Sequence, residues 1–301
     1  MTDIESRLRA AAFGADTGVP DAVLAEAEIG EADEPLPRWL AAVVLGARGQ
    51  YARAAALLEP LLTCRDGVLA SLAASTLASH RRQLGGHANA RTLDAAALRA
   101  RPGAAGSGAV VGAGDPDGID VAGAVADALL GLAADALALG RQREARTLLA
   151  RVAAANPSCW RTRVRHAWVS AEVELAAGAA VAACPHAERA AAIARERGAS
   201  RHVLKSDLVL AAALGAVGVT RDTAGVIVLA GRVRDDTRKL GLYPLTWPAA
   251  LLLADATGIE DAAAARELRR EASGIVHALL QRADPLGRSL AIASPWVPKV
   301  G

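Results

Sequence analysis

The sequence predicts an all-α protein, and three observations support that fold class. Alanine accounts for 75 of the 301 residues, whereas the chain holds one Phe, two Tyr and one Met. A core of Ala, Leu and Val suits closely packed helices, because Ala has the highest helix propensity and strands favour β-branched and aromatic residues. Apolar residues also recur at helical spacing through most of the chain. Paired segments of similar length then predict an α-solenoid of about six antiparallel helix pairs.

The N-terminal region, residues 1–35, is expected to hold two short helices and an acidic linker. Thr2 and Glu5 match a capping box that opens a helix to about Ala12, and Pro20 suits the first turn of a second helix. We divide the rest into repeats one and two at 36–102, a Gly-rich loop at 103–120, repeats three to six at 121–283, and a C-terminal tail at 284–301.

Six helix pairs are expected from the spacing of apolar residues. They cover residues 39–45 with 54–61, 69–84 with 88–99, 121–139 with 143–155, 160–177 with 186–197, 203–217 with 222–239, and 247–256 with 261–281. The run 225–231, GVIVLAG, has strand-forming residues, but its neighbours favour a helix. The loop at 103–120 is expected to be a flexible linker within or between two helical lobes.

A small residue opens the second helix of each pair, and a glycine usually precedes it by five positions. The small residues are Ala54, Ala90, Ala145, Ala187, Thr223 and Ala263, at spacings of 36, 55, 42, 36 and 40 residues. The glycines are Gly49, Gly85, Gly140, Gly218 and Gly258. Pro102 and Pro157 each follow twelve residues after the small residue. Glycine permits a tight turn, the small residue lets two helices cross closely, and proline ends the second helix.

This pattern resembles the tetratricopeptide repeat family, whose consensus combines Trp, Leu-Gly, Tyr, Ala, an apolar residue and Pro. The residues that carry the resemblance are Trp39, Gly49, Tyr51, Ala54, Leu58 and Leu61, and Gly140, Ala145, Leu149, Val152 and Pro157. The similarity covers about residues 36–281. It departs from the family at Ala182, where Gly is expected before a longer loop, and at Glu267 and Arg270, where the family buries apolar residues.

The fourth pair offers a candidate protein-recognition face on its first helix. Trp160, Val164, Ala167, Ala171 and Leu175 form an apolar stripe that should pack inward. One residue round the helix lie Arg161, Arg165, Trp168 and Glu172. Arg and Trp are favoured anchors at protein interfaces. The alternative is that Trp168 covers a neighbouring repeat while the arginines are solvated around it.

The family resemblance implies that the inner faces of first helices contact partners. It therefore adds six candidate partner-binding residues: Trp39, Ser75, Ser79, Arg82, Asp127 and Lys205. The chain has only two asparagines, Asn89 and Asn156, so the Lys/Asn clamp that some relatives use for a peptide carboxylate is not expected.

Charge is distributed unevenly along the chain. Residues 1–37 carry nine acidic side chains against two Arg, whereas residues 141–205 carry twelve Lys and Arg against five Glu. The basic segment favours an acidic protein or peptide partner and is also the part that could attract nucleic acid. Aromatic residues for base stacking are scarce, which makes nucleic acid the weaker alternative.

Three chemical sites are considered and not favoured. If 160–177 is one helix, Cys159 and Cys184 lie at its opposite ends, about 27 Å apart, so they do not share a metal with His166 or His186. His166, Ser170 and Glu174 lie on one helix face, which lacks the turn and oxyanion site that a reactive serine needs. Gly112, Gly114 and Gly118 have the wrong spacing for a dinucleotide loop.

The sequence therefore predicts a non-enzymatic adaptor or regulator that binds another protein through a concave face, without a cofactor or metal. The alternatives are a regulator that binds nucleic acid or a small ligand through the basic middle region, and an all-α enzyme. The chain has three scattered cysteines, its N-terminus does not match a signal peptide, and no segment is long and apolar enough to suggest a membrane span. These features predict a cytoplasmic protein. Residues 186–202 resemble the helical sensor tails of large bacterial transcriptional regulators. The oligomeric state is left open.

Overall fold

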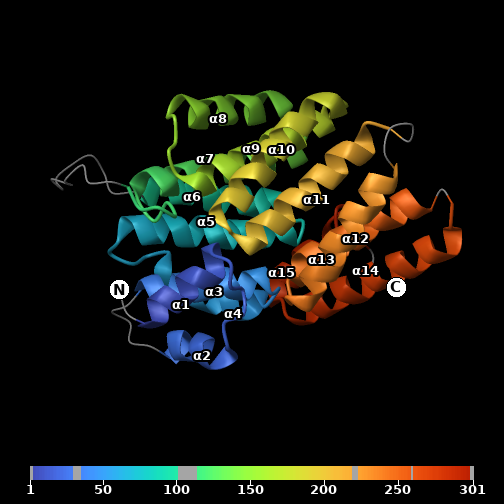
Figure 1. Cartoon of the computed structure of the whole chain (residues 1–301). Helices are drawn as coiled ribbons and strands as arrows, with labels where there is room; N and C mark the ends of the chain where they lie inside the picture. The colour runs from blue at the N-terminus through green and yellow to red at the C-terminus, as the bar shows by residue number, and fades with distance from the viewer. Residues whose placement is uncertain (1–2, 30–34, 101–113, 219–222, 259, 299–301) are drawn as a thin grey trace.

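The structure is a computed structural model that describes residues 3–29, 35–100, 114–218, 223–258 and 260–298 (Figure 1). These residues form fifteen α-helices and contain no strand, so the all-α prediction is confirmed. The helices are α1 (Asp3–Phe13), α2 (Asp21–Ile29), α3 (Pro35–Ala47), α4 (Tyr51–Leu61), α5 (Gly67–Gln83), α6 (His87–Ala100), α7 (Val121–Ala138), α8 (Gln142–Ala154), α9 (Trp160–Ala176), α10 (Ala180–Arg197), α11 (Ser200–Ala216), α12 (Thr223–Lys239), α13 (Tyr243–Thr257), α14 (Ala262–Gln281) and α15 (Pro285–Ala293).

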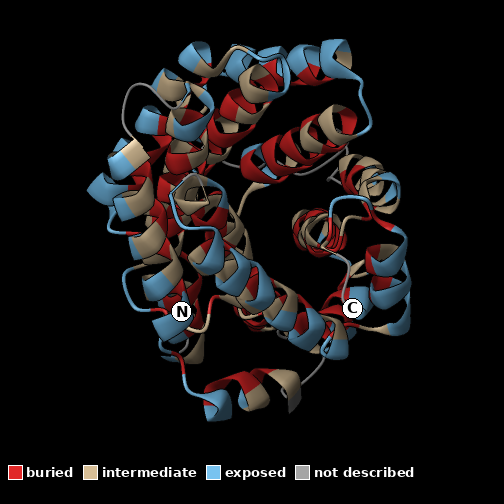
Figure 2. Ribbon diagram, turned by 90° about the vertical axis from the view of Figure 1, so that its right-hand side faces the viewer, coloured by how far each residue is buried: buried red, intermediate tan, exposed pale blue. Residues whose placement is uncertain are grey.

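Each helix packs against the next one along the chain, and the odd-numbered helices also pack against one another. The second set of contacts joins α1 to α3, α3 to α5, α5 to α7, α7 to α9, α9 to α11, and α11 to α13. The odd-numbered helices therefore form a continuous inner row, and most even-numbered helices cover it from outside. Figure 2 shows the helices arranged in a strongly curved row.

Left-handed glycines make the turns within the first four pairs. Gly49, Gly85, Gly140 and Gly178 have φ angles of 75°, 74°, 75° and 72°. The residue five positions after each glycine is an alanine with no exposed surface: Ala54, Ala90, Ala145 and Ala183. A residue with a Cβ is disfavoured at these angles, and an alanine lets the second helix approach the first closely. The glycine-to-alanine spacing read from the sequence therefore does place a turn and a close crossing.

Two details of that spacing were wrong. In the fourth pair α10 begins at Ala180, two residues after Gly178, so the longer loop expected before Ala187 does not exist. Pro185 is the sixth residue of α10, and the helix continues through it although the Val181 carbonyl loses its intrahelical donor. In the sixth pair Gly258 has a φ of −62° and Ala263 is exposed, so neither has the role that the pattern assigned to it.

Both ends of the chain fold back onto the row of inner helices. Helix α1 packs against α11, and after it the Ser200 backbone N–H and side-chain hydroxyl donate to the carbonyl oxygens of Gly14 and Ala15 at 3.0 and 2.7 Å. At the other end Arg81 of α5 pairs with Asp284, the N-cap of α15, at 2.5 Å. These contacts bring the beginning and the end of the row together, and the curved row becomes a ring.

The region expected to be a C-terminal tail contains a helix, α15, whose first turn is capped by Asp284. Beyond it, Val297 is buried in an apolar cluster with Leu84 and Leu279, whereas the Trp296 side chain is 60 % exposed. Capping by Asp at an N-cap followed by Pro is a signal that the sequence already carried. The chain end is therefore part of the ring closure.

Most of the Gly-rich loop at 103–120 lies outside the described residues. Its last part, residues 114–120, is described and is fixed by charge contacts. Arg9 of α1 donates to the carboxylates of Asp115 and Asp117 at 3.0 and 3.1 Å, and Asp120 caps α7 by accepting from the Gly123 N–H. Thr2 and Pro102, which marked a helix start and a helix end, also lie outside the described residues.

One described helix, α7, is long and apolar enough to cross a membrane, and two-thirds of it is buried within the protein. It carries Asp127 and Asp135, both of which make ion pairs with arginines of neighbouring helices. Because both carboxylates of α7 are paired with arginines of other helices, we interpret α7 as a core helix of the protein.

Close packing of α6 against α7 makes a test of the fold. A Cβ at Gly131 of α7 would lie 2.0 Å from an Asp94 carboxylate oxygen, so we expect Gly131→Ala to destabilise the protein by about 1–3 kcal/mol. Gly274→Ala is the matched control: it lies inside α14 with open space around it, and the higher helix propensity of Ala should stabilise by about 0.5–1 kcal/mol. Urea unfolding measures the free energy of unfolding of each variant. If both substitutions changed it equally, the close packing of α6 against α7 would be contradicted.

Candidate functional site

The inner helices enclose a cavity of about 490 Å³. Side chains from α3, α5, α7, α9, α11 and α13 line it, together with Phe13 at the end of α1 and Trp296 and Val297 from the chain end. The concave face expected from successive first helices is therefore a cavity with walls on several sides. A folded protein domain does not fit into a space of this size.

All ten residues that the sequence analysis selected as partner-binding residues line this one cavity. They are Trp39 from α3, Ser75, Ser79 and Arg82 from α5, Asp127 from α7, Arg161, Arg165, Trp168 and Glu172 from α9, and Lys205 from α11. The apolar stripe on α9 packs as expected, with Val164, Ala167 and Ala171 buried. What the ten residues bind stays a prediction.

Arg161 is a structural residue of the wall, which differs from the exposed anchor that the sequence suggested. Its side chain is buried and donates to the Asp117 carbonyl oxygen at 2.6 Å and to the Asp127 carboxylate at 2.7 Å. It therefore ties α9 both to the loop before α7 and to α7 itself. Each of the three Arg161 side-chain nitrogens donates a hydrogen bond within the protein, and a ligand would have to compete with these bonds.

Trp168 and Trp39 also belong mainly to the wall. The Trp168 indole N–H donates to the Ser206 hydroxyl of α11 at 2.9 Å, and its ring stacks on His202 with the centroids 5.6 Å apart. Trp168 thus packs on the next pair, as the alternative expected, but Arg161 beside it is buried and not solvated. The Trp39 indole N–H donates to Thr76 of α5 at 2.9 Å. Both indoles present ring surface to the cavity while their polar atoms are already paired.

Arg82 joins three helices beneath the cavity surface. It donates to Asp94 of α6 at 2.6 Å and to Asp135 of α7 at 2.8 Å, and both carboxylates are completely buried. Burial raises the pKa of Asp94 to about 7, against the attraction of Arg82 and with the repulsion of Asp135. One guanidinium does not fully stabilise the charged forms of two buried carboxylates. With a pKa of about 7, Asp94 is partly protonated at neutral pH.

Three cations remain at the cavity surface, and they lack full compensation. Arg165 contacts Asp127 at 2.5 Å, but that carboxylate is shared with Arg161. Arg201 makes no hydrogen bond or ion pair with any described residue, and the Lys205 ammonium lies 4.6 Å above the Trp168 ring. Burial lowers the pKa of all three groups, that of Arg201 to about 10, and their mutual repulsion adds to the effect.

Two histidines of the wall are kept neutral. Burial lowers the pKa of His80 to about 3, and burial together with the positive charge of Arg201 lowers the pKa of His202 well below its ordinary value. His80 packs beside Tyr51 and leaves no room for a Cβ at Gly46, and His202 lies between Trp160 and Trp168. Both rings therefore act as aromatic packing surfaces.

Sequence reasoning missed Arg201 and His202 because it began the helix at Val203, whereas α11 begins at Ser200. With the true start, Arg201 and Lys205 are one helical turn apart, a signal that the sequence contained. It also missed Trp247, which lies on the first helix of the expected sixth pair, and Trp296, which reaches the cavity only because the ring closes. No local pattern could have placed Trp296 there.

The structure describes two of the chemical sites that the sequence analysis considered. The Ser170 hydroxyl donates to the carbonyl oxygen of His166, and Glu174 pairs with Arg146 at 2.5 Å, so the two side chains are used separately. Within the described part of the chain, no group of three or more His, Cys, Asp or Glu is arranged to hold a metal ion, and Cys64, Cys159 and Cys184 are free and half-buried. Gly112, the first glycine of the third candidate site, lies outside the described residues.

The basic segment 141–205 does not present its charge on one surface. Four of its cations line the cavity: Arg161, Arg165, Arg201 and Lys205. Four others make ion pairs with carboxylates elsewhere: Arg141, Arg146, Arg195 and Arg197. The remaining four, Arg143, Arg151, Arg163 and Arg189, are exposed on α8, α9 and α10, so the positive charge of this segment is divided between the cavity and the outer surface. This division offers no single basic face for tracking a nucleic-acid backbone.

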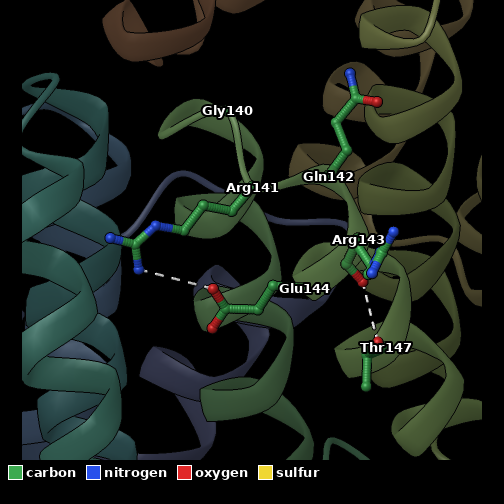
Figure 3. A pocket seen from close by; sticks show the side chains of 6 residues that line it. All are labelled: Gly140, Arg141, Gln142, Arg143, Glu144 and Thr147. Carbon is green, nitrogen blue, oxygen red and sulfur yellow. Dashed lines mark hydrogen bonds and ion pairs between the residues drawn. The ribbon is translucent and has the colours of Figure 1, made fainter.

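A second depression lies at the turn between α7 and α8 (Figure 3). Its volume is about 600 Å³, but one turn and the first residues of one helix make its lining. Arg141 and Glu144 pair with each other at 3.8 Å, and the Thr147 hydroxyl donates to the Arg143 carbonyl (Figure 3). Side chains from opposite walls do not converge there, so the central cavity is the better candidate site.

Comparison with known proteins adds no assignment: no protein-family model matches the chain, and no curated protein matches it.

The role of Arg161 in the wall can be measured directly. We expect Arg161→Ala to lower the free energy of unfolding by about 3 kcal/mol, because it removes one partner of a buried ion pair and frees two backbone carbonyls. Arg163→Ala, two residues along α9 and exposed, should change it by less than about 0.5 kcal/mol. Denaturant titration compares the two variants; similar values would contradict a structural role for Arg161.

The raised pKa of Asp94 predicts a pH dependence of stability. Between about pH 4 and pH 7 the folded state keeps a proton that the unfolded state has released, so this carboxyl makes stability fall as pH rises. Asp94→Asn mimics the protonated form and should flatten that part of the stability curve. Melting temperatures measured from about pH 5 to pH 8 test this. An unchanged slope in Asp94→Asn would assign the pH dependence to other groups.

Proposed function

We propose that the chain is a degenerate tetratricopeptide-like α-solenoid that acts, without catalysis, as an adaptor or regulator by binding a short extended segment of a partner protein in its central cavity. The observation that carries this proposal is the convergence of residues from six successive inner helices on one cavity. Repeat proteins of this architecture use the concave surface of successive repeats for binding.

The size of the cavity limits what can enter. A volume of about 490 Å³ is within the range of sites for small molecules, about 300–1,000 Å³, and it admits a few residues of extended chain. Aromatic surfaces of Trp168 and Trp247, and the half-buried side chains of Ser79 and Glu172, offer apolar and polar contacts to such a segment. The partner would therefore contribute a peptide, with its folded part outside the ring.

The titratable groups favour binding over catalysis. A general base works best when its pKa lies near the working pH, and His80 and His202 are shifted far below it. Asp94 has a pKa near 7, but it is completely buried and bonded to Arg82. A reacting group would not reach it from the cavity.

A second candidate function is the binding of a small ligand by the same cavity. It is favoured by one observation, the enclosure of incompletely paired cations in a space of small-molecule size. Such a ligand could regulate the protein by bridging inner helices that are far apart in the sequence.

Filling the cavity tests the proposed peptide binding. A library of short random peptides would be selected on the wild-type protein, and the affinities of the selected peptides measured by fluorescence anisotropy. We expect Ser79→Trp, which places an indole in the cavity, to reduce binding at least about tenfold. Ala182→Trp, on the exposed side of α10, is the matched control and should leave binding unchanged. Peptides that bind both variants equally would place recognition outside the cavity.

A further inference from the structure

The cavity carries more positive than negative charge. Five cations line it, Arg82, Arg161, Arg165, Arg201 and Lys205, whereas the carboxylates that line it are Asp127 and Glu172. Two further carboxylates, Asp94 and Asp135, lie behind the wall and bind Arg82. Even when all four carboxylates are ionised, one positive charge remains without a counterpart, and protonation of Asp94 leaves two.

The excess charge is concentrated on three neighbouring side chains. Asp127 is already occupied by Arg161 and Arg165, and Asp94 and Asp135 bind Arg82. Arg201 has neither a hydrogen bond nor an ion pair to any residue that the structure describes. Lys205 has its aromatic contact with Trp168 and the attraction of Glu172, without an ion pair to a described residue. Arg165, Arg201 and Lys205 all line the same cavity.

Cations in such a place destabilise the empty protein. Removing a charged group from water is costly unless an opposite charge compensates it, and repulsion between like charges adds to the cost. The lowered pKa values of Arg165, Arg201 and Lys205 report both effects. A surface that served only to pack helices would be more stable with neutral side chains at these positions. The arrangement is explained if an anion supplies the missing charge.

The surroundings of the three cations specify an organic anion. Trp168 lies beneath Lys205, and its ring stacks on His202. Leu208, Val209 and Trp247 add apolar surface to the same cavity. An inorganic ion would leave that surface uncovered, whereas a ligand with an anionic group and an apolar or aromatic part would contact both.

Resting on the proposed use of the cavity as a binding site, we propose that the cavity binds an organic anion whose carboxylate or phosphate group is held by Arg165, Arg201 and Lys205 and whose apolar part packs on Trp168. The anionic group can come from an acidic side chain of a bound peptide or from a free small molecule. Arginine suits both, because its planar donors match carboxylate and phosphate oxygens.

The first test needs no ligand. If the cations lack compensation within the protein, Arg201→Gln and Lys205→Met should each raise the melting temperature, because each removes an uncompensated charge while keeping most of the side chain. Arg163→Gln, an exposed position on α9, is the control and should leave it unchanged. A lower melting temperature in both cavity variants would overturn the proposal, since it would show that the two charges are stabilised within the chain.

The second test uses charged probes and their neutral counterparts on the same proteins. One arm compares phenyl phosphate and benzoate with benzyl alcohol at millimolar concentration. The other compares capped peptides of alternating Leu and Glu with peptides of Leu and Gln. A probe that binds the folded state raises its melting temperature. We expect anionic probes alone to stabilise the wild type, and Arg201→Gln and Lys205→Met to weaken their binding at least about tenfold.

The two arms separate this inference from the proposed function. Preference for the Glu peptide over the Gln peptide supports both and assigns the anion to a partner protein. Binding of phenyl phosphate or benzoate with no peptide binding supports the anion site and overturns the peptide adaptor. Equal binding of Glu and Gln peptides without any response to small anions supports the adaptor and overturns the anion site. Anion binding that persists in both variants overturns the assignment to these residues.

Discussion

Neighbouring helices of this protein meet at alanines that have no exposed surface, and the rest of the structure depends on that close approach. Ala54, Ala90, Ala145 and Ala183 each follow a left-handed glycine by five residues, so the first four crossings begin from the same turn geometry. Because these alanines lie on the second helix of each pair, they let it pack closely on the first, inner helix. The residues that face inward can then be long and charged, since they contribute to the cavity wall and not to the helix crossings.

Local sequence signals predicted most of the helices, but they did not predict that the row of helices closes into a ring. The spacing of apolar residues and glycines located fourteen of the fifteen helices, and the same face of successive first helices supplied ten residues that do line one cavity. An error of three residues at the start of α11 was enough to lose Arg201 and His202. The contact that Trp296 makes with the cavity joins parts of the chain too far apart for any periodic pattern to link.

Charge separates the wall of the cavity into two kinds of surface. Arg82 and Arg161 are held by carboxylates and backbone carbonyls, and they fix α5 and α9 against α7. Arg201 and Lys205 lie beside them without such partners. Basic side chains in the wall therefore have two roles: some hold helices together, and others carry charge without an ion pair. Which role a side chain has depends on whether an Asp of an inner helix lies close to it.

The ring is covalently continuous everywhere except where the two ends of the chain meet the row, at the Ser200 contacts with residues 14 and 15 and at the Arg81 pair with Asp284. Widening the ring elsewhere would have to separate consecutive helices that are closely packed, and close-packed interiors resist such separation. At the seam it needs the parting of those polar contacts and of the apolar cluster that holds Leu84, Leu279 and Val297. An occupant that widened the cavity would therefore have to open non-covalent contacts made by both ends of the chain.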